Sequence, residues 1–196
     1  MYSAFLTQTL ATAELDKYYT FEGGFSREQV AMLEKQVSDS NIQMNEASTF
    51  SGAGDALRKS RVGWLPMNEN FLWLHEKLGD MVNIANKELW RFDIAGMAES
   101  IQYAEYPADG GHYDWHMDTG PDQFSRRKIS ITVQLSDPSE YEGGDLQLKI
   151  NSGHQNTPKG FGTVVIFPSY LLHRVTPVTG GLRKSLVLWI TGPAFK

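Results

Sequence analysis

The feature that most constrains the fold is a change in the spacing of apolar residues at about position 97. Beyond it, apolar and polar residues alternate over 129–135 and 146–150, which is the two-residue period of a strand with one buried face. Short apolar runs at 163–167 and 185–191 lie between Gly and Pro residues and indicate buried strands. No helix-length segment separates these strands, which disfavours a parallel β-α-β arrangement.

Helical spacing is confined to the first half of the chain. The segment Ser26–Gln29 has the spacing of a capping box and predicts a helix over 27–38. An apolar stripe over 71–85 predicts a second helix that begins after Asn68 or Asn70. Two helices followed by about seven or eight short strands predict a mainly β fold. We expect a double-stranded β-helix, or jelly roll, with two or more N-terminal helices as a buttress.

Length and composition are those of one domain. A chain of 196 residues with 41% hydrophobic residues would bury roughly 70% of its unfolded surface. We therefore expect a single domain over 1–196, with a helical part at about 1–95 and the jelly-roll core at about 96–196. The first ten residues lack the features of a signal peptide, and no apolar run approaches the roughly 20 residues that cross a bilayer. These observations predict a cytoplasmic protein without a membrane partner.

Charge bears on the choice of partner. The net charge of −5 argues against broad contact with a nucleic-acid backbone. Two basic clusters, at 58–61 and 126–128, are interpreted as solvated loop charge, with contact to an acidic ligand as the alternative.

The histidines and carboxylates suggest a metal site. The chain has no cysteine, so a metal must be held by nitrogen and oxygen ligands. His116 and Asp118 lie two apart in the segment 111–120, and such residues project from the same face of a strand. His173 follows 55 residues after Asp118, at the start of another predicted strand. Two histidines and one carboxylate form the facial triad of non-haem iron(II) oxygenases. His112 and Asp114 have the same spacing and are the alternative pair.

Arg183 adds a second, independent signal. It lies ten residues beyond His173, next to an apolar strand, where a fixed cation needs a partner anion. The planar donor fork of arginine matches the distal carboxylate of 2-oxoglutarate, and Ser185 is placed to add a hydroxyl. A structural arginine satisfied within the protein is the alternative.

Taken together, the HxD pair, the distal histidine and the arginine resemble the prolyl 4-hydroxylase-like branch of the Fe(II)/2-oxoglutarate dioxygenases. The segments 135–148 and 167–190 are similar to the corresponding strings of bacterial PKHD-type hydroxylases. The resemblance covers about 101–191. It includes Tyr106 and Tyr113, ten and three residues before His116, and this spacing favours His116 over His112.

The resemblance implies a cofactor set and a reaction. Fe(II), 2-oxoglutarate and O2 are expected, with ascorbate as a candidate additional cofactor. Oxidative decarboxylation of 2-oxoglutarate to succinate and CO2 would accompany hydroxylation of an aliphatic carbon. The related halogenases carry a small residue where Asp118 stands, which favours hydroxylation. A prolyl residue of a protein or peptide is the expected substrate. A free amino acid or other small molecule is the alternative, followed by a nucleic-acid demethylase and a non-catalytic metal-binding jelly roll.

The resemblance also assigns residues around the metal. Tyr106 should border the 2-oxoglutarate, and Trp189 should line its pocket. Candidate substrate contacts come from the segment 56–66, which resembles the part of prolyl hydroxylases where substrate approaches, from the metal strand and from the loop 119–128. They are Arg58, Arg61, Trp64, Tyr113, Trp115 and Arg126. An ordinary connecting loop is the alternative for 56–66, and the loop 119–128 is expected to be a mobile lid.

Overall fold

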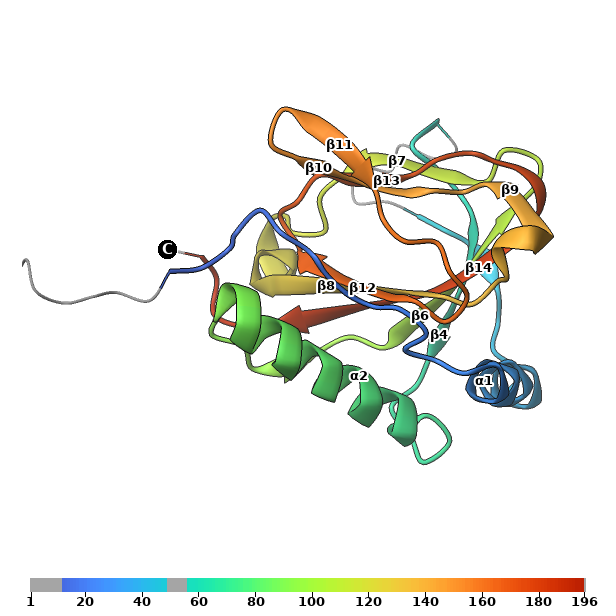
Figure 1. The fold of residues 1–196 in the computed structure, drawn as a ribbon. Coiled ribbons are helices and arrows are strands. Elements are labelled where there is room, and N and C mark those ends of the chain that lie inside the picture. Colours follow the sequence, from blue (N-terminus) through green and yellow to red (C-terminus); the bar gives the residue numbers. More distant parts are fainter. Residues whose placement is uncertain (1–11, 49–55, 196) are drawn as a thin grey trace, which may run out of the picture.

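Two antiparallel sheets facing each other make up most of the molecule in the computed structural model, which describes residues 12–48 and 56–195 (Figure 1). The larger sheet has the order β1 (Tyr19–Phe21), β12 (Val164–Pro168), β8 (Arg127–Gln134), β14 (Val178–Thr191), β6 (Ile101–Pro107), β4 (Arg61–Leu65) and β2 (Asn45–Glu46). Two further strands, β5 (Gly96–Met97) and β9 (Tyr141–Gly143), pair with β14. The smaller sheet has the order β11 (Gly153–Asn156), β10 (Leu146–Ile150), β13 (His173–Val175), β7 (His112–His116) and β3 (Arg58–Lys59). The predicted jelly roll is confirmed.

Two α-helices cover the outer face of the larger sheet (Figure 1). The first, α1 (Arg27–Asp39), begins at the predicted capping box, in which the Ser26 hydroxyl accepts from the backbone N–H of Gln29 at 3.3 Å. The second, α2 (Leu72–Ala85), continues into a π-helical turn at Asn86–Trp90. Both predicted helices are therefore confirmed. Neither has the length and apolar character that crossing a membrane requires, within the part of the chain described.

The strand β8 separates two interiors. Its side chains alternate between the helix-covered core, which contains Ile129, Ile131 and Val133, and the space between the sheets. All eight residues of β8 are buried, including polar ones. The alternation in the sequence suggested one buried face and one in solvent. In the structure the polar face of β8 lies inside the molecule, so it must serve polar partners there.

Four short strands of the first half join the sheets, namely β1 to β4. They have two to five residues each. Apolar periodicity needs a window of about four to eight residues to identify a strand, so β1, β2 and β3 are too short to give a signal. In the five-residue β4, apolar and polar residues do not alternate strictly. The chain before residue 96 thus contributes sheet edges as well as the helical buttress. One of these edges, β3, pairs with β7.

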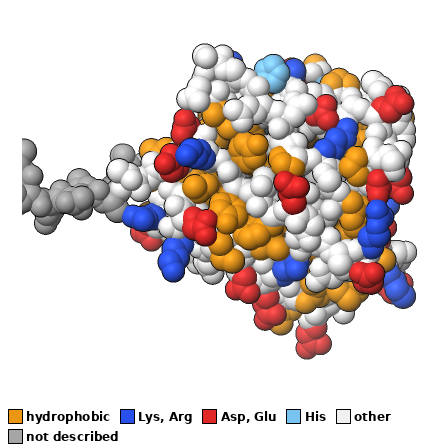
Figure 2. All heavy atoms as spheres, in the orientation of Figure 1, with side chains coloured by type: hydrophobic (Ala, Val, Ile, Leu, Met, Phe, Trp, Pro, Cys, Tyr) orange, Lys and Arg blue, Asp and Glu red, His pale blue; other side chains and the backbone are white. Residues whose placement is uncertain are grey.

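The surface in the orientation of Figure 1 carries both signs of charge. Figure 2 shows Lys and Arg side chains interspersed with Asp and Glu, among apolar groups, over this face. No extended basic patch lies on the face shown.

Candidate active site

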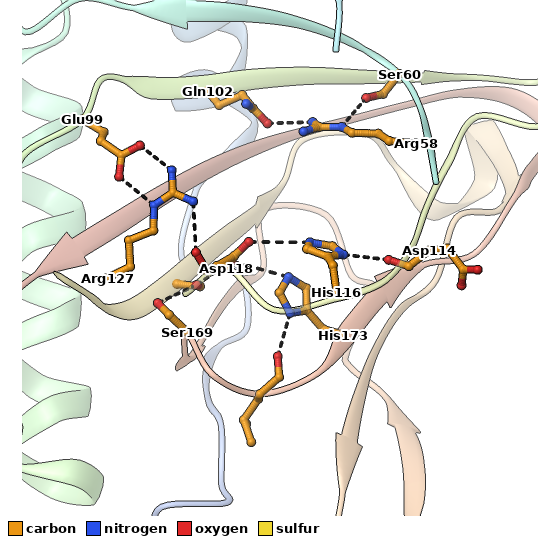
Figure 3. Close-up of polar contacts among 12 residues, drawn as sticks. Arg58, Ser60, Glu99, Gln102, Asp114, His116, Asp118, Arg127, Ser169 and His173 are labelled. Atoms are coloured by element: carbon orange, nitrogen blue, oxygen red, sulfur yellow. Dashed lines mark hydrogen bonds and ion pairs between the residues drawn. The ribbon is translucent and has the colours of Figure 1, made fainter. Parts of the chain in front are cut away.

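His116, Asp118 and His173 converge between the sheets because β7 and β13 are neighbours. His173 is the register partner of His116 across this antiparallel pair. The Nε2 atom of His116 lies 3.6 Å from Asp118 Oδ1, and that of His173 lies 3.5 Å from Asp118 Oδ2 (Figure 3). One potential ligand atom from each residue lies within 4.8 Å of the other two. The sequence suggested His116, Asp118 and His173, and the pairing of β7 with β13 brings His173 beside the other two.

Each histidine is held in one orientation by the backbone. The Nδ1 of His116 lies 2.7 Å from the carbonyl oxygen of Asp114, and the Nδ1 of His173 lies 2.8 Å from that of Leu171. A carbonyl oxygen only accepts, so these Nδ1 atoms carry protons, and the Nε2 atom of each ring lies toward Asp118. This is the arrangement in which proteins present imidazole to a metal ion. The donor set fits a divalent metal with two nitrogen ligands and one carboxylate.

Asp118 is held by the hydroxyl group of Ser130. The Ser130 hydroxyl donates to Asp118 Oδ2 at 2.6 Å and lies 2.9 Å from the Ser169 hydroxyl. Burial raises the pKa of Asp118, but His173, His116 and the Ser130 hydroxyl together hold this pKa well below its usual range. The carboxylate is therefore ionised at neutral pH.

His173 is neutral at the same pH. Burial and the neighbouring His116 lower its pKa to about 4, against opposing contributions from Asp118 and the Leu171 carbonyl. A metal requires a deprotonated imidazole and an ionised carboxylate. Both groups are thus in the protonation state that a metal site needs.

The alternative pair, His112 and Asp114, diverges. His112 Nδ1 lies 2.8 Å from the Gly110 carbonyl oxygen, while the Asp114 side chain is 52% exposed and lies 3.9 Å from Arg174. In the described residues, His116, Asp118 and His173 are the one group of three His, Asp or Glu side chains that converges. The geometry favours this group over the alternative.

Arg183 is fully buried in the wall of the same cavity, which has a volume of about 370 Å³. Its Nη2 donates to Gln134 Oε1 at 3.0 Å and its Nη1 to the Ser185 hydroxyl at 3.3 Å. The Tyr106 ring centroid lies 5.1 Å from the guanidinium carbon. The Nε atom has no acceptor, and no carboxylate in the described residues forms an ion pair with Arg183. A buried cation with only neutral partners is costly unless an anion joins it.

Of the other expected site residues, four line the cavity and three do not. Those in the lining are Arg58, Trp64, Tyr113 and Trp189. Arg61, Trp115 and Arg126 lie outside it. For Arg61 and Trp115 the physical reason is the alternation of side chains along a strand, whereas Arg126 is the exposed last residue of a 3-10 helix. On β7, Trp115 precedes His116 and points to the opposite side, where it stacks against Arg174 at 4.7 Å, whereas the exposed Arg61 side chain lies 3.7 Å from Glu105.

The basic clusters are more deeply buried than expected. Arg58, Arg127 and Lys128 are all buried, which corrects the interpretation of these three residues as solvated loop charge, while Arg61 and Arg126 are exposed. Arg127 also lines the cavity, where sequence reasoning had chosen its neighbour Arg126. Its Nη1 donates to the Asp118 carbonyl oxygen at 3.2 Å, its Nε donates to Glu99 at 2.7 Å, and its guanidinium lies 3.7 Å from the centre of Trp189. The pairing of β8 with β14 shifts its register between Ile190 and Thr191, so the alternation over 129–135 does not continue to the adjacent arginines and could not tell which of them enters the cavity.

The loop 119–128 contributes to the cavity. It contains a 3-10 helix, Asp122–Arg126, from which Gln123 and Phe124 reach the lining. Its mobility stays a prediction.

Known proteins match the chain in sequence. Residues 101–191 match the model of the 2OG-Fe(II) oxygenase superfamily. A PKHD-type hydroxylase of Acidovorax ebreus is 42% identical over 165 residues, which cover 79% of this chain and 72% of the relative. A PKHD-type hydroxylase of Teredinibacter turnerae is 42% identical over 87 residues, covering 42% of this chain and 38% of that protein.

Solved structures match the fold. A prolyl hydroxylase from Trichoplax adhaerens, in complex with a hypoxia inducible factor peptide fragment, has a TM-score of 0.75 at 18% identity, covering 90% of this chain and 84% of that one. A Pseudomonas putida prolyl-4-hydroxylase has a TM-score of 0.72 at 20% identity, covering 90% and 93% of the two chains. These structures share the double-stranded β-helix. Since the relative from Acidovorax ebreus matches over most of both chains, this protein belongs to the 2-oxoglutarate- and iron(II)-dependent oxygenases, whose cofactors are Fe(II), 2-oxoglutarate and O2.

Proposed function

We propose that this chain is a hydroxylase that converts 2-oxoglutarate to succinate and CO2 while hydroxylating an aliphatic carbon. His116, Asp118 and His173 hold the iron, and Arg183 holds the distal carboxylate of 2-oxoglutarate. The observation that carries the proposal is the fully buried Arg183, which has only neutral protein partners and lines the same cavity as the three converging side chains.

The residues around Arg183 set the position of the co-substrate. Gln134 and Ser185 orient the guanidinium, and the Tyr106 ring covers it, so its donor fork is preorganised for a carboxylate. Trp189 Nε1 is a second buried donor without an acceptor. Buried donors in proteins are nearly always satisfied, so these N–H groups favour a ligand rich in acceptor oxygens.

The metal and the protein side chains contribute different chemistry. Iron, when bound, supplies the activation of O2, for which protein side chains have no equivalent. The chain contributes the neutral imidazole of His173, the imidazole of His116, an ionised carboxylate fixed by Ser130, and a cavity of about 370 Å³ around them.

For the substrate we propose a prolyl residue of a protein or peptide. The support is the shared fold with prolyl hydroxylases, one of them in complex with a peptide fragment. Trp64, which is 45% exposed and lines the cavity, offers an aromatic surface at its edge. A free amino acid or other small molecule is the alternative. A single domain over 1–196, a cytoplasmic location and the use of ascorbate stay predictions from the sequence.

Turnover of 2-oxoglutarate tests the proposed function. We expect the iron-loaded protein to release succinate, and to release more when a pool of proline-containing peptides is present. Mass spectrometry should find one added oxygen in a peptide that stimulates release. Protein that binds iron and 2-oxoglutarate but forms no succinate under any of these conditions contradicts the proposal.

The metal and the co-substrate should stabilise the protein cooperatively. We expect Mn(II) and 2-oxoglutarate together to raise the melting temperature by more than the sum of their separate effects. Each ligand binds the native state, and chelation of the metal by 2-oxoglutarate couples the two binding free energies. Thermal melts at fixed ligand concentrations measure this. Strictly additive shifts would indicate that the two ligands do not share a coordination sphere.

Gly144 should control the position of Arg183. Its φ of +63° disfavours other residues, and a Cβ atom there would lie 2.8 Å from Arg183 Cδ. We expect Gly144→Ala to displace Arg183, so the dissociation constant of 2-oxoglutarate rises about 10-fold or more while iron affinity stays the same. Gly153→Ala is the control, because a Cβ there meets nothing within 4 Å. Calorimetric titration of both variants measures the effect, and equal affinities for 2-oxoglutarate would contradict it.

A further inference from the structure

Arg58 is a second buried cation in the cavity that has no acidic partner among the described residues. It lies on β3, is 6% exposed and lines the cavity. Its Nε donates to the Ser60 hydroxyl at 2.8 Å and its Nη2 to Gln102 Oε1 at 2.8 Å (Figure 3). Both acceptors are neutral. In residues 12–48 and 56–195, no carboxylate forms an ion pair with Arg58, and Nη1 has no hydrogen-bond acceptor.

The other charges of the cavity are already accounted for. Its charged lining residues are Arg58, Arg127, Arg183, Glu99 and Asp118. Arg127 is paired with Glu99, with 2.7 Å between Nε and Oε1. Under the proposed function, Asp118 faces the metal and Arg183 faces 2-oxoglutarate, and the charges of Fe(II) and 2-oxoglutarate are opposite and equal. Among the described residues of the cavity, one positive charge is left over, and it lies at Arg58.

Tyr113 connects this charge to the metal site without neutralising it. The guanidinium carbon of Arg58 lies 4.6 Å from the Tyr113 ring centroid, and the same ring stacks on His116 with centroids 3.4 Å apart. Burial raises the pKa of Tyr113 to about 12, although Arg58 opposes the shift. The phenol is therefore neutral at pH 7. The Tyr113 ring thus separates Arg58 from His116, and both residues line the same cavity.

We propose that the substrate carries a carboxylate and that Arg58 binds it. This inference rests on the proposed function and names the class of its substrate. Ser60 and Gln102 hold the guanidinium in place, and its unused N–H groups match the oxygen atoms of a carboxylate. The anion compensates a buried charge that would otherwise be costly. Two sources share this chemistry, namely the α-carboxylate of a free amino acid and an acidic side chain of a peptide.

Matched acids and amides test the inference. The probes are the N-acetyl derivatives of the common amino acids, each as the free acid and as the amide, titrated calorimetrically into protein loaded with Mn(II) and 2-oxoglutarate. We expect at least one acid to bind about 10-fold or more tightly than its amide, as a charge-assisted hydrogen bond predicts. Capped dipeptides containing Glu or Gln distinguish the sources. A preference for Glu over Gln points to a peptide side chain, and a preference confined to the free acids points to an α-carboxylate.

Variants of Arg58 test whether this residue causes the preference for acids over amides. Arg58→Gln should bring acid and amide to equal affinity, whereas Arg58→Lys should retain part of the difference. Lys59→Gln, which removes a neighbouring charge that pairs with Asp109, should retain all of it. The inference is overturned if no acid is preferred in the wild type, including the case in which none binds, or if the preference survives in Arg58→Gln.

Titration of 2-oxoglutarate into the same samples distinguishes failure of the proposed role of Arg58 from failure of the proposed function. If 2-oxoglutarate binds normally to the wild type and to Arg58→Gln but no acid is preferred, only the role of Arg58 is wrong. If the wild type does not bind 2-oxoglutarate, the proposed function itself fails.

Discussion

Loss of either histidine of the triad is expected to abolish iron binding at equimolar metal, while loss of His112 leaves it intact. In His116→Ala or His173→Ala only one nitrogen donor would remain beside Asp118, because among the described residues no other His, Asp or Glu side chain converges there. Removal of a group that merely supports a ligand costs about 10- to 100-fold in metal affinity, and removal of the ligand itself should cost more. Metal content after gel filtration measures this.

His112→Ala is the matched control for the triad variants. It removes the same side chain from the same strand, but His112 turns to the Gly110 carbonyl instead of Asp118. If the His112 variant loses iron and the His116 variant keeps it, the metal is held by the alternative pair and the assignment of the triad is wrong.

The second large effect is expected at Arg183. Arg183→Lys keeps the charge but loses the two-pronged donor geometry, so one charge-assisted hydrogen bond to the distal carboxylate should be lost. Such a bond contributes roughly 1.5–3 kcal/mol, which converts to a rise of about 10- to 150-fold in the dissociation constant of 2-oxoglutarate. Arg183→Met should weaken binding further, because it leaves the carboxylate buried without a counter-ion. Calorimetric titration of Mn(II)-loaded protein measures both.

Lys184→Met provides the control on the same strand. Lys184 pairs with Glu34 at 2.8 Å and does not line the cavity. We expect its affinity for 2-oxoglutarate to match that of the wild type. A Lys184 variant that loses 2-oxoglutarate as strongly as Arg183→Met would contradict a specific role for Arg183.

The sequence predicted the fold well because the strands of the second half carry a regular pattern. The alternation at 129–135 identified β8, and the capping box at Ser26 identified the start of α1. The same alternation could not tell whether the polar face of β8 meets solvent or an interior. Ser130 and Gln134 turned out to support Asp118 and Arg183. Alternation in the sequence shows which residues share one face of a strand. What that face contacts depends on neighbouring strands that come from other segments of the chain.

The candidate metal ligands could be selected from the sequence, whereas the other residues that line the cavity were predicted less well. His116, Asp118 and His173 were selected by residue type and spacing, but their convergence depends on the register of β7 against β13, a contact between segments far apart in sequence. Arg127 was missed because it is adjacent to Arg126, and only the strand geometry shows which of the two points inward. Charged residues in a basic cluster are most often exposed, so burial of such a residue is visible only in three dimensions.

The most direct test of the account is the titration of 2-oxoglutarate into the anaerobic iron(II) protein, followed through the metal-to-ligand charge-transfer band. The band forms only when 2-oxoglutarate chelates the iron, so it reports the metal and the co-substrate in one cavity. We predict a saturable band in the wild type, no band in His173→Ala, and a band that needs much higher 2-oxoglutarate in Arg183→Met. Absence of the band in iron-loaded wild-type protein, or an unchanged titration in Arg183→Met, would contradict the account.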